Sequence, residues 1–97
     1  MNKVLFPKKD YVKELVRIFK SSKNSQKLIK TLSKYHEKDI AEAITLLTPA
    51  ERQNIYNVLD EHIIAEIFSY LDDAKDYLEE LSLEKAARVV SYMDSDD

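Results

Sequence analysis

The sequence predicts an all-α fold, a small solenoid of short helices, from three observations. Apolar residues recur at three- and four-residue intervals along most of the 97-residue chain, which is the spacing of amphipathic helices. A residue type that favours helix N-termini directly follows each of the later apolar stripes. The helices also form pairs that repeat every 22 to 24 residues. Helices this short are unstable in isolation, so we expect them to stack and bury their stripes against one another.

Residues 1–24 predict a basic amino-terminal helix followed by a turn. The apolar stripe of this helix comprises Tyr11, Val12, Leu15, Val16 and Phe19. The polar run 21–25 predicts the turn. A second, lysine-rich helix follows, and its stripe comprises Leu28, Ile29, Leu32 and Tyr35.

Five shorter helices are predicted from Lys38 onward, and we assign residues 25–97 to one domain of short-helix repeats. Their stripes are Ile40, Ala43, Ile44 and Leu47; Ile55, Val58 and Leu59; Ile64, Ile67, Phe68 and Leu71; Ala74, Tyr77, Leu78 and Leu81; and Ala86, Val89, Val90 and Met93. The N-cap candidates that follow them are Thr48, Asp60, Asp72, Ser82 and Asp94. The clearest is Thr48-Pro49-Ala50-Glu51, which has proline at N1 and a glutamate that closes a capping box.

The repeat is also visible as recurring residues. Ile40-Ala41-Glu42 recurs as Ile64-Ala65-Glu66, Leu47 corresponds to Leu71, and a degenerate third copy appears at Ala86-Ala87-Arg88 and Met93. The periodicity predicts a solenoid but does not give its hand.

The composition excludes several classes of function. The chain has no cysteine, and therefore no disulfide, thiolate nucleophile or sulfur-ligated zinc site. It has no glycine, which excludes P-loop and dinucleotide-binding motifs. His36 and His62 are too far apart for a zinc site, and we expect them to be cap or surface residues. No acid–base pair is predicted to be buried, so we predict that the chain is not an enzyme. It carries no signal peptide and no apolar run of membrane length, so we expect it to be soluble.

The charges are divided between the two parts of the chain. Residues 1–38 carry eleven of the fifteen Lys and Arg residues, and residues 39–97 carry fifteen of the eighteen Asp and Glu residues. The most basic stretch contains Lys20, Lys23, Lys27, Lys30, Lys34 and Lys38. Arginine is nearly absent there and the aromatic rings fall in apolar stripes, so we predict no nucleic-acid partner. Three alternatives stay open for this stretch: contact with lipid phosphates, docking on the acidic repeats of a neighbouring subunit, and a solvated lysine face, of which the solvated face is the simplest.

Several short motifs, in order, resemble the amino-terminal domain of MgtE magnesium transporters over roughly residues 25–97. They are His36-Glu37-Lys38-Asp39-Ile40-Ala41-Glu42, Leu47-Thr48-Pro49-Ala50-Glu51-Arg52, Ala65-Glu66-Ile67, Leu78-Glu79-Glu80-Leu81-Ser82 and Met93-Asp94-Ser95-Asp96-Asp97. The resemblance implies a right-handed superhelix on the cytoplasmic side of the bacterial cell membrane, followed by paired CBS domains and a transmembrane pore. It also implies a homodimer in which Mg²⁺ between this domain and the CBS domains favours the closed state.

By resemblance, Glu66 and Asp96 fall on positions where the family places magnesium ligands, and Asp97 is the next candidate. Without the resemblance, Glu66 is an ordinary surface acid, and Asp94, Asp96 and Asp97 suit the cap and first turn of a further helix. We therefore expect the domain to continue past Asp97. The alternative function is a protein-interaction scaffold similar to the middle region of the flagellar switch protein FliG.

Overall fold

The computed structural model describes residues 8–21 and 25–94, and these ranges contain seven helices and no strand. The all-α prediction is confirmed. The helices are α1 (Lys8–Ser21), α2 (Ser25–Leu32), α3 (Glu37–Ile44), α4 (Pro49–Val58), α5 (Glu61–Phe68), α6 (Ala74–Leu78) and α7 (Leu83–Asp94). No helix in the described part of the chain has the length and apolar character needed to cross a bilayer.

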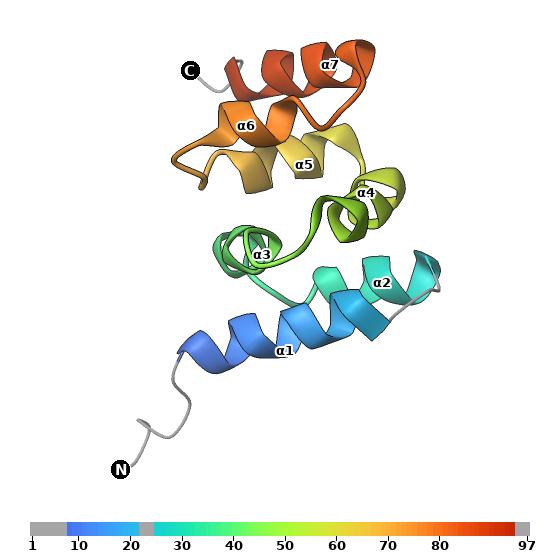
Figure 1. Ribbon diagram of the computed structural model, residues 1–97, viewed down its shortest axis with the longest axis vertical. Helices are drawn as coiled ribbons and strands as arrows, with labels where there is room; N and C mark the ends of the chain where they lie inside the picture. Colours follow the sequence, from blue (N-terminus) through green and yellow to red (C-terminus); the bar gives the residue numbers. More distant parts are fainter. Residues whose placement is uncertain (1–7, 22–24, 95–97) are drawn as a thin grey trace.

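The helices stack along the long axis of a molecule that measures 47 × 33 × 21 Å (Figure 1). The odd-numbered helices pack in sequence, α1 on α3, α3 on α5 and α5 on α7, and α1 also touches α4. The two inner helices of this series, α3 and α5, therefore each lie between a predecessor and a successor, as the repeat predicts. The right-handed winding of the stack stays a prediction.

Four helices end in the same turn. After α3, the N–H groups of Thr45, Leu46 and Leu47 donate to the carbonyls of Ala41, Ala43 and Ile44 at 3.3, 3.0 and 3.1 Å. The corresponding three bonds close α2, α5 and α6. Tyr35, predicted to lie within the second helix, is instead the last residue of the turn after α2. The last two hydrogen bonds of this turn join residues that are three apart instead of four, so the chain is wound more tightly there. This keeps the final residue of each stripe near the core although its helix has ended.

The predicted caps have different outcomes. Thr48 forms the full capping box with Glu51, and Ser82 Oγ accepts from the N–H of Lys85 at 3.2 Å. Asp60 occupies the N-cap of α5, but its side chain makes no capping bond. The prediction that Asp72 is a cap is wrong by one residue, because α6 begins at Ala74 and its N-cap is Asp73. Asp94 is the last residue of α7, and its predicted role as a cap of a further helix stays a prediction because residues 95–97 lie outside the described ranges.

His36 is the N-cap of α3, which confirms the cap interpretation for that residue. Its Nδ1 accepts from the N–H of Lys38 at 3.0 Å. The ring also packs edge-on against Tyr70, with 5.7 Å between ring centroids. His36 therefore anchors the start of α3 to the turn after α5.

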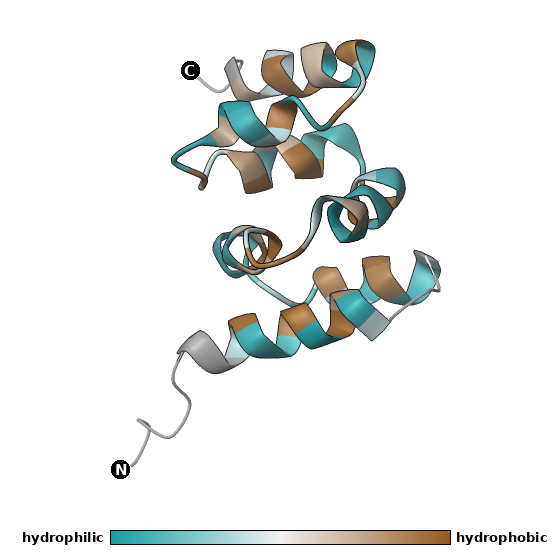
Figure 2. Ribbon diagram, viewed as in Figure 1, coloured by the Kyte–Doolittle hydropathy of each residue, from teal (hydrophilic) through white to brown (hydrophobic). Residues whose placement is uncertain are grey.

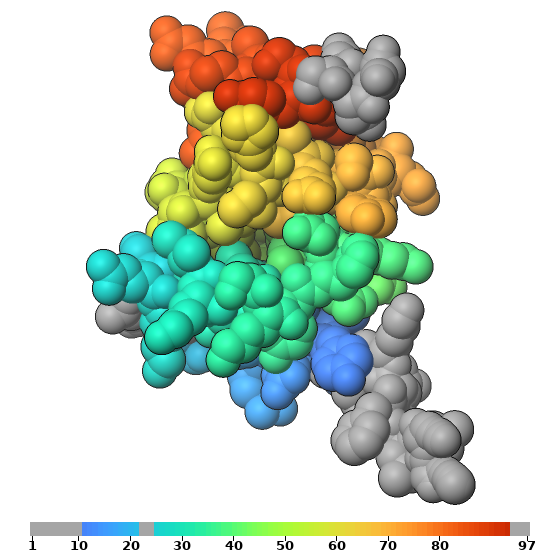
Figure 3. Space-filling model, turned by 180° about the vertical axis from the view of Figure 1, so that it is seen from behind, coloured from blue at the N-terminus to red at the C-terminus, as the bar shows by residue number. Residues whose placement is uncertain are grey.

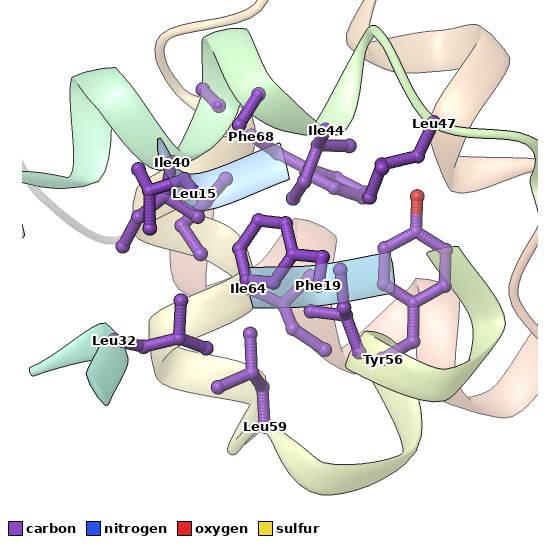
Figure 4. Close-up of a cluster of buried hydrophobic side chains, with 14 of the residues drawn as sticks. Leu15, Phe19, Leu32, Ile40, Ile44, Leu47, Tyr56, Leu59, Ile64 and Phe68 are labelled. Atoms are coloured by element: carbon purple, nitrogen blue, oxygen red, sulfur yellow. The ribbon is translucent and has the colours of Figure 1, made fainter. Parts of the chain in front are cut away.

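One continuous core runs through the stack and draws on most of the predicted stripes (Figure 4). Leu15 of α1, Ala43 of α3 and Val89 of α7 are fully buried, and Tyr56 and Phe68 pack edge-to-face with centroids 5.8 Å apart. Most apolar residues turn inward and most charged residues lie outside, so the helices show both colours in Figure 2. Burial of these stripes stabilises the stack.

Candidate functional site

Glu66 lines a groove of about 430 Å³ between α5 and the end of α7. The other residues that line the groove are His62, Ala65, Ser69, Tyr70, Tyr92 and Met93. The core side of α5 carries Ile64, Ala65, Ile67 and Phe68. Glu66 lies between these residues in sequence but is exposed, as the sequence predicted.

The neighbours of Glu66 form walls of the groove and leave its carboxylate accessible. Ser69 Oγ donates to the carbonyl of Glu66 at 2.6 Å, so this hydroxyl is bound to the backbone. His62 lies one turn before Glu66 and stacks on Tyr92 of α7, with ring centroids 3.7 Å apart. Among the described residues, no Lys or Arg nitrogen lies within 4.0 Å of the Glu66 carboxylate. Glu66 is therefore an acid without a basic partner at that range.

The repeat produces a second groove of about 280 Å³ between α3 and the turn 69–73. Its residues Lys38, Ala41, Glu42 and Thr45 precede His62, Ala65, Glu66 and Ser69 by 24 positions each. Thr45 Oγ1 donates to the carbonyl of Glu42 at 2.7 Å, the same bond that Ser69 makes. Asp72 and Asp73 also line this groove, and Tyr70 borders both grooves. Among the helix residues that line the two grooves, the main chemical difference is that α3 has Lys38 where α5 has His62.

The predicted metal residues are not brought together within the described ranges. Asp96 and Asp97 lie outside the described residues, and Glu66 is the one predicted ligand that the structure places. Within residues 8–21 and 25–94, no three His, Asp or Glu side chains converge on a point where a metal ion could bind. Glu66 thus offers one carboxylate to a site that other groups must complete. Because Mg²⁺ retains several waters and binds through one or two carboxylates, this donor fits part of such a site.

An ionic network, buried at Arg52 and partly buried at Glu80, connects α4 to the turn after α6. Arg52 of α4, only 8% exposed, donates from Nε and Nη2 to the two carboxylate oxygens of Glu80 at 2.9 and 2.6 Å. Its Nη1 donates to the carbonyls of Leu47 and Ile44 at 2.5 and 3.3 Å. Tyr56 Oη donates to Glu80 Oε1 at 2.9 Å.

This network connects α4 to both sides of the turn after α6. Gln53 Nε2 donates to the carbonyl of Glu80 at 2.6 Å, and Lys85 Nζ of α7 donates to the carbonyl of Tyr56 at 2.7 Å. The hydrogen bond from Arg52 lowers the pKa of Glu80 although burial opposes the shift. Burial, followed by the bond to Glu80, raises the pKa of Tyr56. The charged form of Glu80 is therefore stabilised, and the network is a structural clamp between repeats.

No sequence motif pointed to this clamp. As a dense group of acids in sequence, Asp72, Asp73, Asp76, Glu79 and Glu80 predict a mostly solvated face, and for Glu80 this prediction is wrong. The one available signal was that Arg52 is among only four basic residues in the acidic part of the chain.

The basic stretch lies on the outside of the stack. Lys30 and Lys34 are exposed on and just after α2, which belongs to the turquoise-to-green band just below the middle of the face in Figure 3. Lys20 forms a 3.3 Å ion pair with Glu51, so the basic and acidic parts of the chain meet at that point. Lys23 lies outside the described residues.

Comparison with known proteins identifies the family. No curated protein and no solved structure matches the chain significantly. A family model, the MgtE intracellular N domain, matches residues 35–97, which include both grooves and the Arg52–Glu80 clamp. The match covers well over half of the chain, and the chain therefore belongs to the MgtE intracellular N domain family.

Proposed function

We propose that this chain is the regulatory, magnesium-sensing domain of a magnesium transporter, on the cytoplasmic side of the bacterial cell membrane. Membership of the MgtE intracellular N domain family supports the transporter assignment. The observation that carries the sensing role is the exposed Glu66 carboxylate in a groove where no basic side chain neutralises it within 4.0 Å among the described residues. The role is regulatory rather than enzymatic.

In this proposal, Glu66 supplies one part of a Mg²⁺ site at an interface, and Asp96, then Asp97, are the next ligands from this chain. A partner surface, the CBS domains of the same transporter, completes the site. Hydrated Mg²⁺ suits such an arrangement, because it needs few protein oxygens. A domain that supplies so few ligands binds the ion weakly when alone.

Charge explains why the ion controls docking. Within residues 39–93 there are twelve acidic residues and four basic ones, so the repeats carry a net charge of about −8. When Mg²⁺ is scarce, an acidic partner is repelled and the domain separates from it. When Mg²⁺ is plentiful, the bound ion neutralises the facing carboxylates and favours the closed state of the dimeric transporter.

The test is the magnesium dependence of ion flux through the full transporter, reconstituted in vesicles. We expect Glu66→Ala with Asp96→Ala to keep the transporter conducting at Mg²⁺ concentrations that close the wild type. Glu42→Ala, at the equivalent place in the other groove, is the matched control and leaves the Mg²⁺ dependence unchanged. An unaltered closing response in the double variant would refute the proposal.

An exposed apolar strip on α7 favours a second candidate, the interaction scaffold. Leu83 is 90% exposed and Val90 is 37% exposed, whereas Phe68, the counterpart of Val90 in α5, is 1% exposed. This face of α7 can pack against a partner helix, as α5 packs against α7. The scaffold predicts partner binding that does not depend on the cation.

A further inference from the structure

The end of the molecule formed by α1 and α2 is basic, and it lies at the opposite end of the long axis from the Glu66 groove (Figure 1). Residues 11–34 carry seven basic side chains against the single acid Glu14. The six that the structure describes are Lys13, Arg17, Lys20, Lys27, Lys30 and Lys34. Almost all of this end precedes the segment matched by the family, which begins at residue 35. Family membership therefore assigns it no role.

The positive charge is concentrated on one side of α2. Residues 25–34 contain three lysines and no acidic residue. Leu28 and Leu32 fix the buried side of the helix, and Lys27 and Lys30 lie on its exposed side, three residues apart. Lys34 is exposed in the turn that follows the helix. The nearby acid Glu14 accepts a 3.0 Å hydrogen bond from Tyr35 Oη. The exposed side of α2 therefore presents a positive potential to the solvent.

The side chains of this surface favour an anionic lipid surface over nucleic acid as the partner. Tyr11 and Tyr35, the neighbouring rings, pack edge-on against each other with centroids 6.4 Å apart, so they are not free platforms for nucleic-acid bases. Lysine is a compact point charge that suits diffuse attraction to a charged surface more than base readout. Ile29, next to Lys30 in sequence, is 44% exposed and can enter an interfacial layer.

We propose that the lysine side of α2, with Lys34 in the turn after it, is a docking surface for an anionic lipid bilayer. The acidic repeats are repelled by the same bilayer, so only the α1–α2 end can approach it. The molecule is thereby oriented with its Glu66 groove away from the lipid, towards solvent and partner domains. This surface is separate from the grooves, so the proposal does not depend on magnesium binding.

The test is co-sedimentation of the 97-residue chain with vesicles, without Mg²⁺ and at low ionic strength. We expect binding to vesicles of phosphatidylcholine with one third phosphatidylserine, none to phosphatidylcholine alone, and release by salt. Lys30→Gln with Lys34→Gln weakens binding about 25-fold, at roughly fivefold per lysine. Lys75→Gln, an exposed lysine of α6, is the control and changes binding less than about twofold.

Three results would overturn the proposal. The first is equal binding to neutral and anionic vesicles, and the second is no binding to anionic vesicles. The third is a loss of vesicle affinity in Lys75→Gln as large as the loss in Lys30→Gln or Lys34→Gln measured singly. Tighter binding to duplex DNA than to anionic vesicles at the same salt would assign the surface to another polyanion. Glu66→Gln leaves vesicle binding intact, so failure of the magnesium proposal is recognised separately.

Discussion

Removal of the Glu80 charge is expected to destabilise the fold strongly, although Glu80 lies in a turn. Glu80→Gln keeps the size of the side chain but leaves one oxygen to serve three donors, two from Arg52 and one from Tyr56. Arg52 cannot turn to solvent, because it is 8% exposed. Loss of one partner of a buried pair costs about 3–5 kcal/mol. The Glu80 side chain is 20% exposed, so we expect about 3 kcal/mol, at the lower end of that range.

The assay is urea and thermal unfolding followed by circular dichroism at 222 nm. A loss of about 3 kcal/mol corresponds to a fall in Tm of roughly 12–24 °C for a domain of this size. Glu79→Gln is the matched control, because Glu79 is the exposed neighbour and its change should stay within about 0.5 kcal/mol. If the two variants have equal stability, the clamp does not connect the repeats as described.

The remaining predictions concern pH, a helix cap and the groove. The fold lowers the pKa of Glu80, so the stabilisation that this carboxylate gives the fold is complete above its unfolded-state pKa and is lost as the pH falls through its pKa in the folded state. The free energy of unfolding should therefore fall more steeply with decreasing pH for the wild type than for Glu80→Gln, as acid unfolding measures. Thr48→Ala removes the capping box of α4 and should cost about 1 kcal/mol in urea unfolding. His62→Lys places an ammonium one turn from Glu66, and in nuclear magnetic resonance titrations it should weaken Mg²⁺ binding at Glu66 severalfold, whereas Lys34→Arg should not.

The helix stack could be predicted because its signals are local. The apolar residues of each stripe, such as Ile40 and Ile44, recur with the period of a helix, and that period alone determines which side is buried. The order of the stack follows from the repeat, since each short helix needs a neighbour on both sides. Asp72 shows the limit of local signals: two adjacent aspartates are equally good caps, and the path of the turn decides between them.

The polar sites depend on contacts that sequence spacing does not reveal. Arg52 and Glu80 lie 28 residues apart, and neither residue type predicts burial. The groove could be anticipated only in part. The exposure of Glu66 follows from the helical period, but its wall of Tyr92 comes from α7 and depends on how that helix packs.

The most direct test of the magnesium-sensing claim is the affinity of this chain for the paired CBS domains of its transporter, measured by titration calorimetry with and without Mg²⁺. We predict binding in millimolar Mg²⁺, loss of binding when a chelator removes the ion, and loss in Glu66→Gln at any Mg²⁺ concentration tested. Glu42→Gln should bind as the wild type does. Binding that is equally tight with and without Mg²⁺ would contradict the account and would favour the scaffold.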